Sequence, residues 1–400
     1  LQEINKAMRL AQIPRAQAAL VSLNPEDGAL RAVVGGFAYS ASNFNRATTA
    51  KRQPGSSFKP FVYTASFERG YSPSSIVLDA PVVFKDRKGN VWRPKNDRGG
   101  FMGPIRLREA LVQSRNLVSV RLLDGIGVNY ARDYITRFGF SKDSLPANLS
   151  MSLGTASLTP MSVARGYTVF ANGGYLVDPY FIRSITDTDG IVIAYTHPKR
   201  ACALCPERLA GDVSKALVVD GFDLSADGLG RNDTAQNTGM FDPAFVGPPL
   251  TALAPQTIDP RNAFLISDMM LDVVRRGTAV EAKVLNRPDI GGKTGSTNDH
   301  RDAWFSGSGG NLVTTVWVGR DDYKPLGYGE YGGRAALPIW IDYMRVALDG
   351  VPPKNMEPPA GIIKSANGDY FKEEQYDLEM MQVPSDESFQ QQTEQAYDIF

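Results

Sequence analysis

Three short motifs, in a fixed order along the chain, carry side chains that together could transfer an acyl group through a serine ester. They are Ser56-Ser57-Phe58-Lys59, Ser114-Arg115-Asn116 and Lys293-Thr294-Gly295. Each motif alone is weak evidence, since Ser-x-Asn also fits residues 22–24 and 296–298. The first of these precedes the Ser-x-x-Lys motif, the second overlaps Lys-Thr-Gly, and Lys-Thr-Gly occurs once. The order and spacing of the three motifs therefore carry the prediction.

The first motif supplies a nucleophile and a base. A serine hydroxyl is a weak nucleophile at neutral pH and needs a base within hydrogen-bond distance. If Ser56 begins a helix, Lys59 lies on the same face, where burial and a second cation such as Lys293 would lower the pKa of its amine. The helix N-terminus adds a partial positive charge. Taken alone, the same two residues also fit a helix N-cap and a solvated lysine.

The second motif suits the opposite wall of the same cleft. The Ser114 hydroxyl could relay a proton between Lys59 and a leaving amine, and the Asn116 amide could hold a substrate peptide group through its donor and its acceptor. The alternative for this motif alone is an N-cap serine and a turn asparagine between two helices.

The third motif suits recognition of a substrate backbone. Gly295 lacks a side chain, so an extended peptide could lie against this segment as an added strand. The hydroxyls of Thr294 and Thr297, together with the Lys293 ammonium, could hold a terminal carboxylate.

Backbone groups of the first and third motifs also suit an oxyanion hole, formed by the N–H groups of Ser56 and Ser296. The glycines before the third motif could instead end a phosphate-binding loop. That loop needs a glycine where Arg287 stands and a helix afterwards, so we reject it. A Ser-His-Asp triad fits poorly, because His197 lies in an irregular segment and His300 in a polar turn.

The predicted elements place the motifs at helix starts and on a strand. Segments bounded by turn residues predict strands at residues 18–23, 30–35, 291–297, 302–307 and 312–319. Helical periodicity with start and stop signals predicts helices at residues 56–68, 107–112, 117–123, 130–138, 161–171, 263–275 and 338–348. The first two strands form a hairpin and the last three an antiparallel meander.

Other stretches lack regular periodicity. Residues 85–103 are predicted to form a basic surface hairpin or loop, and residues 186–262 are irregular, with a long surface excursion at 221–260. Beyond the Pro-Pro pair at 358–359, the Gln- and Glu-rich tail lacks helical or strand periodicity and is expected to be partly disordered.

The composition describes a globular chain. Its 400 residues, 42% hydrophobic and 22% charged, can bury a large core. A net charge of zero argues against a nucleic-acid binder, although residues 366–400, with nine acidic residues and one lysine, are strongly acidic. The chain has no run of 18 apolar residues. It begins at Leu1 without a signal peptide or anchor, and we interpret it as a fragment.

The two cysteines do not decide the function. A zinc site at Cys202 and Cys205 would need two more ligands, and the chain has only two histidines. The surrounding proline-flanked loop favours a structural role, as a local disulfide or plain thiols, over a redox motif.

Five further segments accompany the three motifs: Val34-Gly35-Gly36-Phe37, Phe44-Asn45-Arg46-Ala47, Arg52-Gln53-Pro54-Gly55-Ser56, Ala171-Asn172-Gly173-Gly174 and Asp302-Ala303-Trp304-Phe305. With these segments, the span from about residue 18 to 350 resembles the transpeptidase domain of class A (bifunctional) penicillin-binding proteins of the Gram-negative type. The resemblance implies an α+β fold with a central antiparallel sheet flanked by helices.

The resemblance also implies D,D-transpeptidation on peptidoglycan stem peptides that end in D-Ala-D-Ala, with β-lactam antibiotics acylating the same serine. It implies no metal or cofactor. The roles it implies by position are a Ser56 nucleophile, a Lys59 base and a second wall of Ser114 and Asn116. The carboxylate and oxyanion side would be formed by Lys293, Thr294, Gly295, Ser296 and Thr297. Ser296 stands where many relatives have threonine.

The domain organisation follows from the same resemblance. We expect residues 1–17 to be a remnant of a linker or OB-like domain, residues 18–350 to be the transpeptidase domain, and residues 351–400 to be a Pro-rich and then acidic tail. The parent protein would carry a membrane anchor and a glycosyltransferase domain and would act at the periplasmic face of the inner membrane. Other cell-wall synthesis proteins are candidate partners. The sequence leaves the acceptor amine and the oligomeric state open.

Two rival functions remain open at this point. A D,D-carboxypeptidase or β-lactam hydrolase would acylate the same serine and then transfer the acyl group to water. The deacylating Glu-x-x-Leu-Asn motif of class A β-lactamases is matched only by residues 281–286, which are one residue too long, so we expect slow deacylation. The other rival is a non-catalytic penicillin-binding module that becomes acylated and goes no further.

Overall fold

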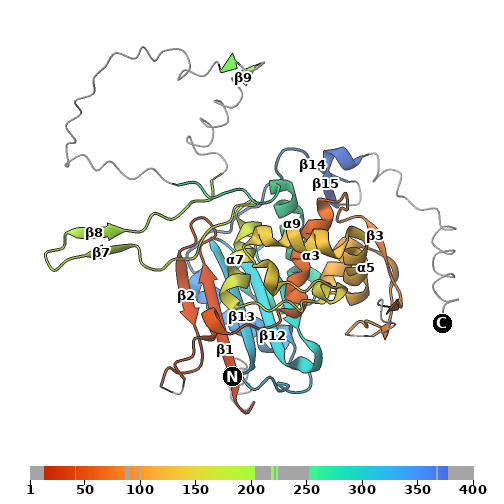
Figure 1. Cartoon of the computed structure of the whole chain (residues 1–400), viewed down its shortest axis with the longest axis horizontal. Coiled ribbons are helices and arrows are strands. Elements are labelled where there is room, and N and C mark those ends of the chain that lie inside the picture. Colours follow the sequence, from red (N-terminus) through yellow and green to blue (C-terminus); the bar gives the residue numbers. More distant parts are fainter. Residues whose placement is uncertain are drawn as a thin grey trace.

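A five-stranded antiparallel sheet runs through the middle of the molecule (Figure 1). This computed structural model describes residues 13–40, 42–85, 91–97, 99–202, 218–219, 222–223, 252–365 and 368–376. The strands lie in the order β11 (Gly291–Ser296), β12 (Asp302–Gly309), β13 (Leu312–Arg320), β1 (Ala16–Leu23) and β2 (Leu30–Val34). Strand β11, which carries the third motif, is therefore an edge strand.

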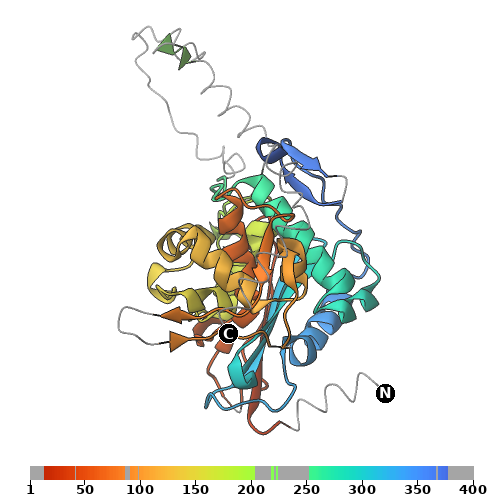
Figure 2. The same ribbon diagram turned by 90° about the vertical axis from the view of Figure 1, so that its right-hand side faces the viewer.

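Helices cover both faces of this sheet (Figure 2). Helix α7 (Pro160–Ala171) packs on β1 and β13, and α11 (Leu337–Ala347) packs on β12 and β13 from the other side. Because both faces are covered, β13 is buried along nearly its whole length, including the polar side chains of Thr314 and Thr315. Helix α9 (Pro260–Arg276) lies against the edge strand β11.

The helical side is built around α3 (Lys59–Phe67), whose nine residues are all buried. A helix buried on every side belongs in the core. The ring of Phe61 lies at the centre of an aromatic cluster, at centroid distances of 4.9–5.4 Å from Phe58, Phe138, Phe140, Tyr167 and Phe170. The helices α4 (Leu107–Val112), α5 (Asn116–Ile126) and α6 (Val128–Ile135) complete this half. The shorter helices are α2 (Arg46–Thr49) and α10 (Gly332–Ala335).

Buried polar contacts tie the chain just before Ser56 to the sheet. The Arg52 guanidinium donates to Asp302 Oδ1 at 2.8 Å, and both side chains are nearly inaccessible to solvent. Trp317 Nε1 donates to the same carboxylate oxygen at 2.8 Å. One strand over, Trp304 Nε1 donates to the carbonyl of Gln53 at 2.8 Å. The segment before Ser56 is thus anchored to β12 and β13.

Every helix and strand predicted above is present, with ends within three residues of the prediction. The basic stretch at 85–103 contains the predicted hairpin, formed by β4 (Phe84–Lys85) and β5 (Val91–Trp92). The short strands β3 (Ile76–Asp79) and β6 (Gly103–Arg106) pair beside it. The α+β class with a central antiparallel sheet is confirmed.

Three expectations need correction. The predicted helix at 56–68 begins with a 3-10 turn, Gly55–Phe58, so the α-helix starts at Lys59. The irregular segment after residue 186 includes part of an exposed hairpin, β7 (Ser184–Thr186) with β8 (Val192–Tyr195), which projects from the body (Figure 1). The tail also contains a hairpin, β14 (Ile362–Lys364) with β15 (Tyr370–Lys372), that packs on the body.

Some expectations fall on residues outside the described ranges. These are most of the surface excursion at 221–260, Cys205, residues 1–12 and the tail from residue 377 onward. Within the described part of the chain, no helix is long and apolar enough to cross a membrane.

The buried ion pair predicts a large stability effect. Arg52→Ala should lower the free energy of unfolding by about 3–5 kcal/mol, because it leaves the Asp302 carboxylate buried without its cation. Chemical denaturation at pH 7 measures this change. The matched control is Arg345→Ala, which breaks an exposed pair with Asp342 and should cost about 0.5 kcal/mol or less. Equal losses in the two variants would contradict the anchoring role of Arg52.

Candidate active site

The structure brings the three motifs together where the 3-10 turn, the start of α5 and the edge strand β11 meet. Ser56 lies in the turn Gly55–Phe58, and Lys59 is the first residue of α3. Ser114 lies in the tight turn between α4 and α5, and Lys293 lies on β11. The Ser57 hydroxyl donates to the carbonyl of Lys293 at 3.1 Å, which joins the 3-10 turn to the strand.

The Lys59 amine is buried and faces the second motif. Its Nζ donates to the carbonyl oxygen of Ser114 at 2.7 Å and to Asn116 Oδ1 at 2.8 Å, and it lies 3.4 Å from Ser114 Oγ. The pKa of Lys59 is lowered to about 7, mainly because the amine is buried; the Arg115 cation acts in the same direction, and the Asp97 and Asp79 carboxylates oppose the shift. Close to neutral pH, a large fraction of the amine is therefore uncharged.

The hydrogen-bond geometry suits a neutral amine. A neutral lysine has two N–H donors and one lone pair. The two close acceptors, Ser114 O and Asn116 Oδ1, take both donors. The lone pair then remains to accept a proton from a hydroxyl on the cleft side. This is the arrangement that a general base needs.

The Ser114 hydroxyl bridges two lysines. Lys293 Nζ donates to Ser114 Oγ at 2.8 Å, and the Lys59 amine lies 3.4 Å away on the other side. The backbone of Ser114 is left-handed, with φ of 56°, which few serines adopt. Such strained residues persist where the surroundings hold them firmly. The hydroxyl can pass a proton between the Lys59 side and a group bound beside Lys293.

Two glycines let the turn Gly55–Phe58 and the edge strand β11 touch through their backbones. A Cβ on Gly55 would lie 2.3 Å from the carbonyl oxygen of Ser296, and a Cβ on Gly295 would lie 2.2 Å from that of Pro54. No side chain fits at either position. This approach puts the backbones next to Ser56 and at Ser296 side by side, as an oxyanion hole built from their N–H groups requires.

The hydroxyls after Lys293 already have partners. Thr294 Oγ1 shares a hydrogen bond of 2.7 Å with Thr278 Oγ1, Ser296 Oγ accepts from Gly332 N–H at 2.9 Å, and Thr297 Oγ1 accepts from Asp302 N–H at 2.9 Å. In the threonine pair only one hydroxyl donates, so the other proton stays available to a carboxylate. Sequence reasoning missed Thr278, because no motif surrounds it.

Asn116 is more tightly held than the sequence suggests. Its Oδ1 accepts from Lys59, and its Nδ2 donates to Lys95 O and to Asp97 Oδ1, each at 2.9 Å. Both amide protons are therefore engaged by the segment at residues 95–97. A substrate carbonyl that binds this amide must replace one of the two acceptors.

Ser56 itself is 8% exposed, and its hydroxyl makes no hydrogen bond to any described residue. The neighbouring backbone is fixed by α7, where Tyr167 donates its hydroxyl proton to the Ser57 carbonyl at 2.7 Å. The backbone of the turn is thus fixed, and the Ser56 hydroxyl is not engaged by another described residue, so it is available to a substrate carbonyl.

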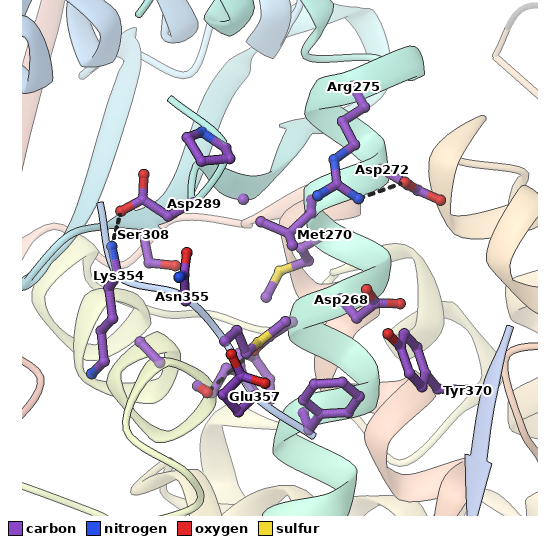
Figure 3. Close-up of a pocket in the computed structure, with 18 of the residues that line it drawn as sticks. Asp268, Met270, Asp272, Arg275, Asp289, Ser308, Lys354, Asn355, Glu357 and Tyr370 are labelled. Atoms are coloured by element: carbon purple, nitrogen blue, oxygen red, sulfur yellow. Dashed lines mark hydrogen bonds and ion pairs between the residues drawn. The ribbon is translucent and has the colours of Figure 1, made fainter. Parts of the chain in front are cut away.

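A separate hollow of about 980 Å³ lies beside the outer face of α9 and contains none of the motif residues (Figure 3). Its walls come from α9, the start of β11 and the segment that leads to β14. Several of its acidic side chains bind arginines: Asp268 pairs with Arg108, Asp272 with Arg276 and Asp289 with Arg287. The hollow does not share the chemistry of the motif cleft.

Ser56, Lys59, Ser114 and Lys293 thus lie in one cleft, with the side chains that acyl transfer through a serine ester requires. The family model described as "Penicillin binding protein transpeptidase domain" matches residues 18–203. The chain belongs to this family, and its class A, Gram-negative type, expected from the motifs, is confirmed.

Relatives and solved structures agree on this family. The chain is 49% identical over 359 residues to "Penicillin-binding protein 1A" of Pseudomonas aeruginosa, covering 89% of this chain and 43% of that protein. It is 45% identical over 367 residues to the protein of that name from Neisseria gonorrhoeae, covering 91% of this chain and 40% of the relative. The chain thus spans less than half the length of these relatives.

The crystal structure of Penicillin-Binding Protein 1A from Haemophilus influenzae superposes with a TM-score of 0.76 at 36% identity, covering 90% of this chain and 54% of that one. The PonA1 protein from Mycobacterium tuberculosis, solved in complex with penicillin V, has the same fold, with a TM-score of 0.65 at 22% identity and coverage of 90% and 85%. The family fold therefore extends over most of this chain.

The lowered pKa of Lys59 predicts a pH profile. The rate of Ser56 acylation by an activated ester such as p-nitrophenyl acetate should rise about tenfold per pH unit below pH 7 and level off above it, because only the neutral amine accepts the serine proton. Stopped-flow release of nitrophenolate measures this rate. Lys59→Arg, which stays protonated throughout, should lose both the rise and most of the rate. A flat profile between pH 5.5 and pH 9 would contradict Lys59 as the base.

Proposed function

We propose that this domain is a peptidoglycan D,D-transpeptidase, with the site residues in the roles expected from their motifs. The observation that carries the proposal is the buried Lys59 amine, with its pKa of about 7, on the turn after Ser56 and linked through Ser114 to Lys293. The family membership and the names of the relatives support the same reaction.

In the first half-reaction, Ser56 Oγ attacks the carbonyl carbon of the penultimate D-Ala of a stem peptide, and the neutral Lys59 takes the hydroxyl proton. The negative charge on the carbonyl oxygen is stabilised by the backbone N–H groups of Ser56 and Ser296, whose segments meet at Gly55 and Gly295. The carboxylate of the terminal D-Ala is bound by Lys293 and by the Thr294–Thr278 hydroxyl pair. The Thr297 hydroxyl, which accepts from the Asp302 N–H and keeps its own proton, donates to the same carboxylate.

Collapse of this intermediate breaks the C–N bond and leaves an ester on Ser56. The departing amine of D-Ala receives a proton from Lys59 by way of the Ser114 hydroxyl, which lies between the two lysines. In the second half-reaction, an amine from a neighbouring strand attacks the ester and its proton returns along the same route. The products are a new amide bond and free Ser56.

Transfer of the acyl group to an amine, rather than hydrolysis of the Ser56 ester, is favoured because no carboxylate among the described residues is placed to deprotonate an attacking water. Among the described residues, no carboxylate makes a hydrogen bond to Ser56 or Lys59. The Asp97 carboxylate, beside the second wall, is engaged by the Asn116 amide, and the Asp79 carboxylate by Arg115. A β-lactam that acylates Ser56 should therefore remain attached for a long time.

The wider setting of the domain is also a proposal. Residues 18–350 form the transpeptidase domain. The longer parent protein is anchored in the inner membrane, faces the periplasm and carries a glycosyltransferase domain. Its substrates are peptidoglycan stem peptides, its inhibitors are β-lactams, and its partners include other cell-wall synthesis proteins.

The direct prediction is a single stable adduct with a fluorescent penicillin. Intact-mass spectrometry should show one added penicillin per chain, with a half-life of hours, because no base activates water near the ester. Ser56→Ala should abolish the adduct, whereas Ser141→Ala, on an exposed loop, should leave it unchanged. A folded Ser56→Ala protein that still forms the adduct would remove Ser56 as the nucleophile, and turnover within seconds would favour the β-lactam hydrolase.

A further inference from the structure

A buried carboxylate lies behind the second wall of the site and takes no part in the mechanism above. Asp79, at the end of β3, is fully inaccessible to solvent. Its Oδ2 accepts from Arg115 Nε at 2.7 Å and from the backbone N–H of Met102 at 3.0 Å, and its Oδ1 accepts from Asn96 Nδ2 at 2.9 Å. A buried charge with this many donors is firmly placed.

Asn96 connects Asp79 to the start of α5 by hydrogen bonds on both sides of its amide. The residue at the N-cap position of α5, Arg115, makes no side-chain capping bond. The cap is supplied instead from twenty residues away: Asn96 Oδ1 accepts from the backbone N–H of Asn116 at 2.9 Å and of Leu117 at 3.3 Å. These are two of the N–H groups that a helix start leaves without partners.

Only an asparagine-like amide can make both connections. Its oxygen faces two helix N–H donors, and its nitrogen faces the Asp79 carboxylate. A second carboxylate at position 96 would face the first across 2.9 Å, and an apolar side chain would leave both sides unsatisfied. Asn96 is itself only 8% exposed, so water does not readily replace it.

The first turn of α5 is the part of the site on which Lys59 depends. Asn116 Oδ1 and the carbonyl of Ser114 are the two close acceptors of the Lys59 amine, and Ser114 holds a left-handed backbone conformation. A shift of this turn would move both acceptors and the relay hydroxyl at once. Displacements of about 1 Å at a reacting centre can cost about 100-fold in rate.

We propose that Asn96, held by Asp79, is a positioning residue for acyl transfer, which fixes the first turn of α5 so that Ser114 and Asn116 meet the Lys59 amine. This inference rests on the proposed function, because the rate that it governs is the acylation of Ser56. Asn96 acts through α5 and touches neither the nucleophile nor the base.

The test compares Asn96→Ala with Asn45→Ala by acylation kinetics with a fluorescent penicillin. Asn45 also caps a helix, α2, through Ala47 N–H at 3.1 Å, but α2 carries no site residue. Asn96→Ala should lower the first-order acylation constant about 10- to 100-fold. The non-covalent dissociation constant should change much less than the acylation constant, since Asn96 makes no hydrogen bond to β11, which carries Lys293 and Thr294. The fraction of chains finally acylated should stay at the wild-type level, and Asn45→Ala should match wild type throughout.

A rescue pair guards against simple misfolding. Asn96→Asp should slow acylation about tenfold or more, because two carboxylates then face each other. Adding Asp79→Asn exchanges the donor and acceptor of the 79–96 contact while keeping one negative charge, and should restore the rate to within about threefold of wild type.

Wild-type acylation rates in Asn96→Ala would overturn the inference alone. The inference would also be overturned if fewer Asn96→Ala molecules became acylated but those that did reacted at the wild-type rate. That result would show only a loss of stability. A folded wild-type protein that forms no adduct would overturn the proposed function, and this inference with it.

Discussion

The site depends on the placement of one amine, the Nζ of Lys59, in a region from which water is excluded. A buried ammonium is unfavourable, so the same burial that lowers the pKa of Lys59 demands acceptors at fixed positions for its remaining protons. Those acceptors come from the turn before α5, which obliges α3 and α5 to meet at their first turns. The aromatic packing around Phe61, and the full burial of α3, maintain that meeting.

A second constraint joins the helical half to the sheet. The segment that carries Ser56 approaches β11 so closely that Gly55 and Gly295 accept no side chain, and the Ser57 hydroxyl binds the carbonyl of Lys293. This contact brings Lys293 to Ser114 and completes the row from Lys59 through Ser114 to Lys293. The Arg52–Asp302 pair lies behind the contact and anchors it to β12. The three motifs thus interlock, and none is placed without the other two.

Sequence reasoning reached the elements and the motif residues because these depend on local patterns. Apolar periodicity and turn residues predicted the sheet and the main helices, and the order of the motifs predicted which side chains would meet. The 3-10 turn at Ser56 was missed, because propensity does not separate it from the α-helix that follows. The short strands of the β14–β15 hairpin were missed because three residues show no alternation. Thr278, Asp79 and Asn96 were missed because their partners are distant in sequence, and only the folded chain brings them to the site.

The central claim is that the Ser56 ester passes to an amine, and a transfer assay tests it most directly. The full domain would be incubated with a stem-peptide mimic ending in D-Ala-D-Ala and an excess of an amine acceptor, and the products would be identified by mass spectrometry. The account predicts one D-Ala released for each new amide formed, with hydrolysed peptide a minor product, and no reaction in Ser56→Ala. Release of D-Ala into hydrolysed peptide alone, whatever the acceptor concentration, would contradict the account and identify a carboxypeptidase.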